Sequence, residues 1–600
     1  MLDRKSLYSS RWFALADLGC AAAGGVSCWL LPQLGPWPLA LAVLPWLARL
    51  LGRRFPFRRT SLDIPVALFL LTALVGAWAS YDRPAATAKL WVLLGAVFFF
   101  YAMAGQPRSN FWLVCAFLSA SAASISIYFL LTNDWRVTHP DLDLINRLAF
   151  PWMALRPKLP APAPQPNIAG GLIALLLPFI IALLLDAWRK GRVWRVLYAL
   201  ATGGMAALGL LMSSSRAAWL ALGLALGGWL LWGLCGFLAR GDLRRRVLIF
   251  ASLATLLLCA AVALALRTPG GPKAWVSRLP GPNSAVSRLE IDRNSLRLVR
   301  DFSFTGGGLH SFAGLFSRYI RGEPNFIFNY GHNLYMDVAL EQGLPGLAAF
   351  LAILAVTTWL LFTGKRGHEL RPVILAALAV MVLHGLVDDP LYASRGTPFL
   401  FLVPGLAVLA TRRAEEPASA ASKGSWRRYV ILAGIAGALL AAAVLATAFR
   451  RPLLSAWYAD LGAVEMARVE LVDFPTGQFD DGRRTAELAP AVALFQKSLA
   501  LDPDNVTANY RLRLVAMMRR DFALAQTYLE KAFTADPGQR GAQKSLGYCY
   551  VWLGQLERAK QTLQGIPEAG REMEAYVSWW QVQGRPDLAT RAEEMAGQLP

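Results

Sequence analysis

Charged and catalytically versatile side chains are scarce in this chain. Only 16% of its 600 residues are charged and 56% are hydrophobic, which excludes an ordinary soluble protein of this size. The six cysteines form no CxxC pair, so they predict neither a disulfide framework nor a metal site. HExxH, P-loop and GxSxG sequences are absent, and the five histidines lack the spacing of a metal cluster. We therefore expect no metal and no cofactor.

Long hydrophobic runs take the place of the missing charge. They recur from residue 12 to about residue 448, and each has roughly 17 to 25 residues, enough for a helix to cross about 30 Å of hydrocarbon. We predict an all-α, polytopic membrane helix bundle over residues 1–451. The predicted spans number about thirteen and cover 12–32, 35–51, 62–80, 86–104, 111–132, 168–187, 196–213, 217–239, 247–266, 334–363, 373–388, 397–411 and 429–448.

Basic residues in the short loops predict the orientation of this bundle. Loops rich in arginine and lysine alternate with loops that hold little beyond Arg83, Arg216 and Arg395. Because cytoplasmic loops carry the basic excess, the N-terminus is predicted to be cytoplasmic, and an odd number of spans exports the C-terminal region. The predicted cytoplasmic segments are 4–11, 53–59, 189–195, 240–246, 364–371 and 411–428.

One long exported segment, about 267–333, is basic beyond what orientation requires. Charge in a long loop has little influence on topology, so this excess points to an anionic ligand, or to a solvated helix face beside anionic lipid headgroups. Topology accounts for much of the net charge of +21, and no nucleic acid partner is expected. The basic residues are Arg267, Lys273, Arg278, Arg288, Arg293, Arg297, Arg300, Arg318 and Arg321, against Glu290, Asp292, Asp301 and Glu323.

Residues 452–600 have a soluble, charged, alanine-rich composition with a period of 34 residues. Ala491, Ala525 and Ala559 align at that period, and the segment 498–538 resembles a tetratricopeptide repeat, with small residues at helix crossings and Asp-Pro turns. We predict an exported α-solenoid with two clear units and a weaker third. Such an array either binds a peptide or protein partner or caps the structure, and it supplies no catalytic group.

The stretch "NYGHNLYMDVALEQGLPG" (329–346) places His332 immediately before an apolar helix. A histidine at the mouth of a membrane bundle can accept a proton, although spacing alone favours an interfacial residue that holds a loop. Upstream lie Arg216, between two tightly joined spans, and an amphipathic stretch at 287–302. The glycine run "FTGGGLHSFAGLF" (304–316) then allows close approach of the backbone to a ligand.

Four short motifs in this order resemble the bacterial O-antigen ligase and O-antigen polymerase superfamily, whose relatives include protein O-oligosaccharyltransferases. They are "SSSRAAWLAL" (213–222), "SRLEIDRNSLRLVRDFSFTGGGLHSF" (287–312), "GHNLYMDVALEQGLPGLAAF" (331–350) and "LHGLVDDPLYASRG" (383–396). The resemblance covers roughly residues 200 to 400. It implies a GT-C-like, metal-independent, inverting glycosyltransferase that moves a glycan from undecaprenyl pyrophosphate to an acceptor hydroxyl.

The resemblance also implies roles for particular residues. His332 would accept or orient the acceptor hydroxyl, and Arg216 and Arg288 would stabilise charge on the pyrophosphate. Glu341 is expected to pack or pair inside the bundle, and Asp388 or Asp389 to line the opposite wall or pair with Arg395. The expected substrate-binding residues are Asn333, Arg318, Arg321, Gly307, Gly308 and Asp388.

Several functions remain open at this stage. A ligase that uses a lipid A core, a polymerase that extends the glycan, and an enzyme that glycosylates a protein share these motifs. A lipid-linked sugar flippase is an alternative of another class, although it predicts ionisable groups deep in several spans and often two related halves. The expected location is the bacterial cytoplasmic (inner) membrane, in contact with membrane lipids, with the repeats on the periplasmic side.

Overall fold

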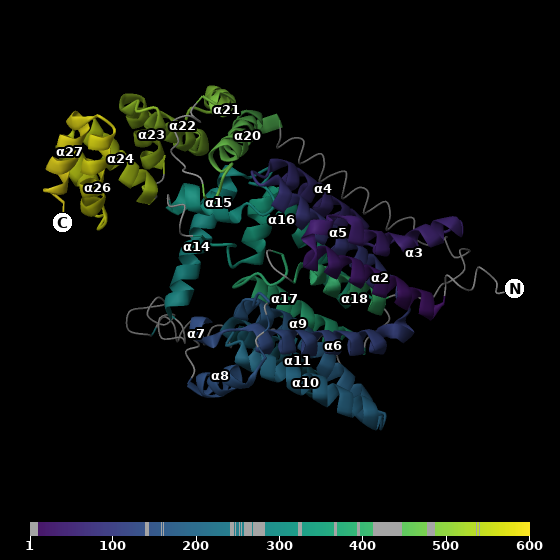
Figure 1. Cartoon of the computed structure of the whole chain (residues 1–600). Helices are drawn as coiled ribbons and strands as arrows, with labels where there is room; N and C mark the ends of the chain where they lie inside the picture. Colours follow the sequence, from purple (N-terminus) through teal and green to yellow (C-terminus); the bar gives the residue numbers. More distant parts are fainter. Residues whose placement is uncertain are drawn as a thin grey trace.

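Figure 1 shows the protein as a computed structural model. The structure describes residues 10–138, 143–157, 159, 161–239, 282–321, 327–364, 369–392, 396–411, 447–476, 486–535, 537–538 and 540–599, with isolated positions between 245 and 267. Within these ranges every regular element is a helix and no strand occurs. The predicted spans 247–266 and 429–448 lie largely outside the described residues, as do Arg395 and the side chain of Arg321.

Helices occupy the other eleven predicted spans, which confirms the helical bundle. Of the described helices, six are long and apolar enough to cross a membrane, so the count of thirteen stays a prediction. Two short helices between α6 and α9 were not predicted: α7 (Trp135–Thr138) and α8 (Asp143–Leu155). The bundle helices are α2 (Arg11–Leu30), α3 (Ala40–Leu51), α4 (Asp63–Ala79), α5 (Arg83–Ala104), α6 (Phe111–Thr132), α9 (Pro166–Arg189), α10 (Val193–Met212), α11 (Arg216–Leu238), α16 (Leu334–Thr363), α17 (Arg371–Gly385) and α18 (Leu402–Thr411).

Helix α9 lies at the centre of a group of five bundle helices. It packs against α6, α10, α11 and α17, and most of its side chains are buried. Two glycines bring its neighbours close: a Cβ on Gly170 would lie 2.7 Å from the Ser215 Cβ, and one on Gly171 would lie 2.6 Å from His384 Cε1. The outward faces of α4, α10 and α11 expose leucines instead, as expected for surfaces that face lipid.

Helix α16 is broken near its middle, and the break receives the glycine run. Gly343 has φ 71° and ψ 178°, a conformation that favours glycine, and Pro345 follows it. The freed backbone groups are bonded by the segment predicted to be exported, which keeps the name exported segment below. Leu344 N–H donates to the Ser303 carbonyl at 2.8 Å. Gly307 N–H in turn donates to the Leu340 carbonyl at 2.7 Å. The glycine run is therefore docked on α16.

The exported segment forms α14 (Pro282–Asp301), α15 (Phe312–Phe316) and a π-helical turn at Ser317–Arg321. Figure 1 shows α14 and α15 between the bundle and the C-terminal helices. One hydrophobic core joins α14, α15 and α16 to the first three C-terminal helices, and a second core lies within the later ones.

The C-terminal region is a chain of helix pairs, as the 34-residue period predicted. Ala491, Ala525 and Ala559 are all buried at the helix crossings, with at most 1% of each exposed. Their lack of bulk lets neighbouring helices approach, which confirms the tetratricopeptide pattern. The helices are α20 (Arg450–Glu470), α21 (Ala489–Leu501), α22 (Val506–Met518), α23 (Phe522–Ala535), α24 (Arg540–Trp552), α25 (Leu556–Leu563), α26 (Ala569–Val582) and α27 (Pro586–Ala596).

Candidate active site

The loop before α16 is shaped by local hydrogen bonds that leave His332 at its tip. Asn333 caps the helix, because its Oδ1 accepts from Tyr335 N at 3.1 Å and Met336 N at 3.2 Å. Gly331 N–H donates to Asp337 Oδ1 at 2.7 Å. His332 itself has φ 55°, a left-handed conformation that is uncommon for residues other than glycine. The backbone thus turns sharply at the histidine.

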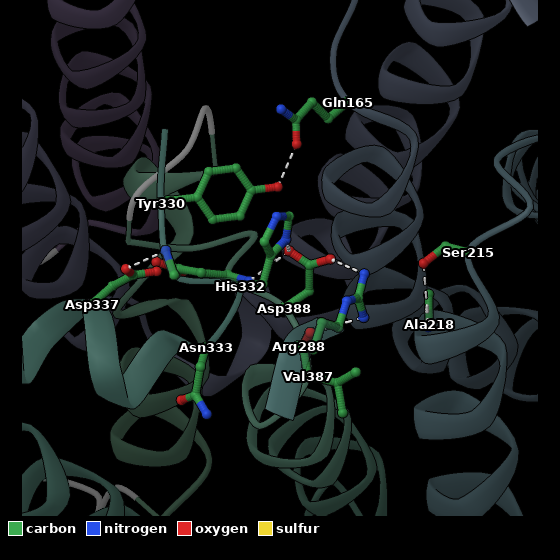
Figure 2. A network of polar contacts seen from close by, with 12 residues as sticks. Gln165, Ser215, Ala218, Arg288, Tyr330, His332, Asn333, Asp337, Val387 and Asp388 are labelled. Carbon is green, nitrogen blue, oxygen red and sulfur yellow. Dashed lines mark hydrogen bonds and ion pairs between the residues drawn. The ribbon is translucent and has the colours of Figure 1, made fainter. Parts of the chain in front are cut away.

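Asp388 joins His332 to Arg288 across the site (Figure 2). Its Oδ1 lies 3.3 Å from His332 Nδ1, and its Oδ2 accepts from Arg288 Nη2 at 3.1 Å. Arg288 Nη1 also donates to the Val387 carbonyl at 2.9 Å. The Asp388 side chain is fully buried, whereas those of Arg288 and His332 are 21% and 23% exposed. The Arg288 and His332 side chains thus cover the carboxylate and remain accessible themselves.

The protonation of Asp388 decides which nitrogen of His332 faces substrate. Burial alone would raise the pKa of Asp388, but the hydrogen bond and charge of His332, with the charges of Arg288 and His384, hold it below the ordinary value. An ionised carboxylate only accepts hydrogen bonds, so His332 Nδ1 carries the proton of that contact. In neutral imidazole, Nε2 is then free to accept a proton.

Tyr330 completes the wall of the site and was not anticipated from the sequence. Its ring lies 4.4 Å from that of His332, centroid to centroid, and its hydroxyl donates to Gln165 Oε1 just before α9. Burial raises the pKa of Tyr330, and the nearby charges of Asp388 and Asp389 act in the same direction. The hydroxyl therefore stays protonated as a donor. In the sequence, the one local sign of this contact was that an aromatic residue lies two positions before His332.

Arg216 is the first residue of α11 and is half-buried. Figure 2 shows Ser215 and Ala218, from the same turn, on the Arg288 side of the cluster. The role of Arg216 in the site stays a prediction. Glu341 matches its expected role, because its carboxylate pairs with Lys89 Nζ at 2.5 Å inside the bundle.

Other predicted substrate-binding residues are occupied elsewhere. Asn333 is 6% exposed and its amide caps α16, with Nδ2 donating to the Leu386 carbonyl at 3.3 Å. A Cβ on Gly308 would lie 2.3 Å from the Ser80 Cα, and one on Gly307 would lie 2.2 Å from Leu315 Cδ1. Both glycines therefore lie in close packing contacts with protein, and their contact with a ligand stays a prediction.

Arg318 requires a second correction. Its guanidinium donates to both Glu470 oxygens, at 2.8 and 3.1 Å, and its side chain is only 7% exposed. It is therefore held by helix α20 of the C-terminal region and does not line the site of His332. The assignment of Arg321 concerns a side chain outside the described residues.

An apolar helix bundle with a polar cluster at a helix mouth, followed by stacked helix pairs, defines a multi-pass membrane protein with a soluble repeat region. Residues 201–351 match the family model described as O-Antigen ligase, and residues 516–578 match that of the Tetratricopeptide repeat. The chain thus carries an O-antigen ligase domain followed by C-terminal tetratricopeptide repeats. A comparison with curated proteins found no match. The O-antigen ligase match contains Arg216, Arg288 and His332 and ends before Asp388.

Proposed function

We propose that the protein transfers a glycan from undecaprenyl pyrophosphate to an acceptor hydroxyl, as an inverting glycosyltransferase of O-antigen ligase type. The observation that carries this proposal is the His332–Asp388–Arg288 cluster, which combines a proton acceptor, an orienting carboxylate and a cation for phosphate. The family match supports the reaction class. The distribution of basic loops supports a reaction on the outer face of the bacterial cytoplasmic membrane, with the repeats on the same side.

In the proposed reaction, His332 Nε2 takes the proton of the acceptor hydroxyl as its oxygen attacks the anomeric carbon. The bond from that carbon to the pyrophosphate oxygen breaks, and both of its electrons leave with undecaprenyl pyrophosphate. Attack opposite the leaving group inverts the configuration. Asp388 stabilises the imidazolium that forms.

Arginine side chains serve the leaving group in this scheme. A guanidinium carries five N–H groups and can bind two phosphate oxygens at once. Arg288 uses two of its N–H groups to hold Asp388 and the Val387 carbonyl, which fixes its orientation beside His332. Arg216, at the start of α11, is the second candidate for the pyrophosphate. Fixed positive charge stabilises the transition state because it needs no reorganisation during the reaction.

The acceptor defines three variants of this function. A lipid A core would make the protein a ligase, a lipid-linked glycan would make it a polymerase, and a protein hydroxyl would make it a protein O-oligosaccharyltransferase. The tetratricopeptide match favours the last as the second candidate, since such repeats bind proteins. A flippase of lipid-linked sugars is less favoured, because the His332 cluster gathers proton-transfer groups at one mouth of the bundle.

Purified protein in nanodiscs, supplied with a lipid-linked donor and each acceptor in turn, tests the proposal. We expect His332→Ala to lower transfer by about 10²- to 10⁴-fold, the usual contribution of a general base. His310→Asn is the matched control, because His310 also lies in the exported segment with φ 61° and is outside the cluster. Wild-type transfer by His332→Ala would overturn the general-base role, and donor translocation without transfer would favour the flippase.

A further inference from the structure

Three buried carboxylates tie the exported segment to the first C-terminal helices. Asp301 belongs to the exported segment, whereas Asp460 and Glu470 belong to α20. Each carboxylate accepts hydrogen bonds from at least two groups of the opposite region, 151 to 210 residues away in the sequence. We refer to α20–α22, with Asp460, Glu470, Thr507 and Arg511, as the repeat clamp.

Asp301, the last residue of α14, forms the first of these contacts. Its Oδ1 accepts from Thr507 Oγ1 at 2.6 Å, and its Oδ2 accepts from Arg511 Nη2 at 2.8 Å. The Arg511 side chain is fully buried, and its guanidinium carbon lies 3.3 Å from the Tyr319 ring centroid. One arginine of α22 therefore holds both the end of α14 and the turn after α15.

Asp460 of α20 forms the second contact, at the start of the glycine run. Its Oδ1 accepts from Phe304 N at 2.8 Å and Thr305 N at 3.3 Å, and its Oδ2 accepts from Thr305 Oγ1 at 2.6 Å. The side chain is buried. This carboxylate supplies acceptors for backbone that leaves α14 and enters the break in α16.

Glu470, the last residue of α20, forms the third contact. It accepts from Arg318 and from the Tyr319 hydroxyl, the latter at 2.8 Å. Tyr510 of α22 adds a hydrogen bond from its hydroxyl to the Tyr319 carbonyl at 3.0 Å. Around these polar groups, apolar side chains of both partners form one continuous core. Buried charges of this kind are tolerated only when paired, so each partner depends on the other.

In the sequence, the residues that the clamp binds, from Asp301 to Tyr319, lie between Arg288 and His332. Asp301 follows Arg288 by thirteen residues on the same helix, a distance of about 20 Å at 1.5 Å per residue. A tilt of about 3° at the clamped end would therefore displace Arg288 by about 1 Å, an error that is large for catalysis. Phe328, four residues before His332, packs on Phe316 with ring centroids 5.6 Å apart in the shared core, so the described approach to the histidine also rests on the clamped segment.

We propose that the repeat clamp positions Arg288 and His332, so that α20–α22 belong to the catalytic unit. The later helices α23–α27 share a second core that reaches the clamp at Ala516 of α22, and we assign them no part in this positioning. The effect on transfer rests on the proposed function, whereas the effect on the exported segment does not. Asp301 and Arg511 act in this scheme as positioning residues.

Hydrogen exchange of the full-length protein in detergent tests the positioning directly. Asp301→Asn keeps the shape of the side chain but removes the charge that pairs with Arg511. We expect amides at 288–300 and 328–333 to exchange about tenfold faster or more. Glu568→Gln is the matched control, because it removes an exposed ion pair with Arg540 in the later repeats, and it should leave both segments unchanged. Thr507→Val serves as the second variant if Asp301→Asn does not fold.

A transfer assay then asks whether the clamp acts through Arg288. In the otherwise wild-type protein, Asp301→Asn should lower transfer about tenfold or more. In an Arg288→Lys protein, the same change should cause a much smaller additional loss, because the residue it positions is already altered. Equal losses in both backgrounds, or unchanged exchange at 288–300 and 328–333, would overturn the proposal. If no acceptor supports transfer, the proposed function fails while the exchange result still decides the clamp.

Discussion

At the scale of single residues, Asp388 contributes two oxygens with different tasks. One oxygen orients His332, and the other holds Arg288. The adjacent Asp389 works differently, since its Oδ1 accepts from the backbone N–H groups of Leu391 and Tyr392. Two neighbouring carboxylates therefore serve the site and the loop, respectively, and this difference can be tested.

We expect Asp388→Asn to lower glycan transfer by about 10²-fold, because the amide neither stabilises imidazolium nor pairs with Arg288. Asp389→Asn is the matched control, since its amide oxygen can still accept from Leu391 and Tyr392. It should leave most of the transfer activity. Initial rates of the two purified variants give the comparison, and equal losses would show that Asp388 has no special role.

Asn333 tests the distinction between a helix cap and a sugar ligand. We expect Asn333→Ser to retain transfer and stability, because serine also caps helices. Asn333→Ala should lower stability by about 1 kcal/mol through loss of the cap. Thermal unfolding in detergent measures both variants beside the rate of transfer. A stable Asn333→Ser protein that no longer uses the donor would instead support binding of sugar by this side chain.

The sequence predicted the members of the cluster better than their contacts. His332, Arg288 and Asp388 were all named from short motifs, yet Asp388 lies 100 residues from Arg288 and 56 from His332. No local period or composition reports such pairings. Tyr330 was missed for the same reason, because its hydroxyl partner, Gln165, is 165 residues away.

At the scale of elements, the glycine run and the broken helix α16 are complementary. The break at Gly343 frees backbone groups, and residues 303–307 bond them. The three consecutive glycines were expected to let the backbone approach a ligand. In the structure Gly306 and Gly308 approach the backbones of Glu341 and Ser80, and Gly307 approaches the Leu315 side chain. Apolar length predicted the long helices well, whereas α7 and α8 are short and were missed because their signal is weaker than that of a membrane span.

Two glycine substitutions should separate backbone packing from side-chain packing. Gly308 has φ 107°, and an added Cβ would meet the Ser80 backbone, which cannot move alone. The Cβ of Gly307→Ala would meet the end of the Leu315 side chain, which can adjust its rotamer. We expect Gly308→Ala to lower the melting temperature in detergent clearly more than Gly307→Ala. Similar melting temperatures would contradict this assignment.

At the scale of the whole molecule, the bundle and the repeats share a core through the exported segment. Composition showed that a soluble repeat region follows the bundle, but it did not predict that Arg318 and Asp301 would pair with that region. These ion pairs join residues 152 and 210 positions apart. The composition of a segment does not reveal whether its excess basic residues bind an anionic ligand or carboxylates of the same chain.

Asp460 gives this interface a dependence on pH. Burial raises the pKa of Asp460 from 3.8 to about 6, although hydrogen bonds from Thr305 and Phe304 oppose the rise. The folded protein therefore binds this proton more readily than the unfolded chain, and the resulting stability is lost as pH rises through 6. We expect about 1 kcal/mol more stability at pH 5 than at pH 7 from this group.

The difference in melting temperature between wild type and Asp460→Asn, measured at both pH values, isolates this contribution from that of other carboxylates. A difference that does not change with pH would show that the pKa of Asp460 is not raised.

The ion pair between Lys89 and Glu341 has a consequence for biosynthesis. Lys89 lies in the second turn of α5, and its partner is made 252 residues later, roughly 13 to 50 s at common rates of translation. During that interval the ammonium group has no Glu341, and a charge in hydrocarbon is expensive unless it reaches the headgroup layer. We therefore expect helix α5 to remain near the interface, or beside the insertion machinery, until α16 is inserted. Formation of this contact between α5 and α16 is then a late step of assembly, which follows synthesis of the exported segment.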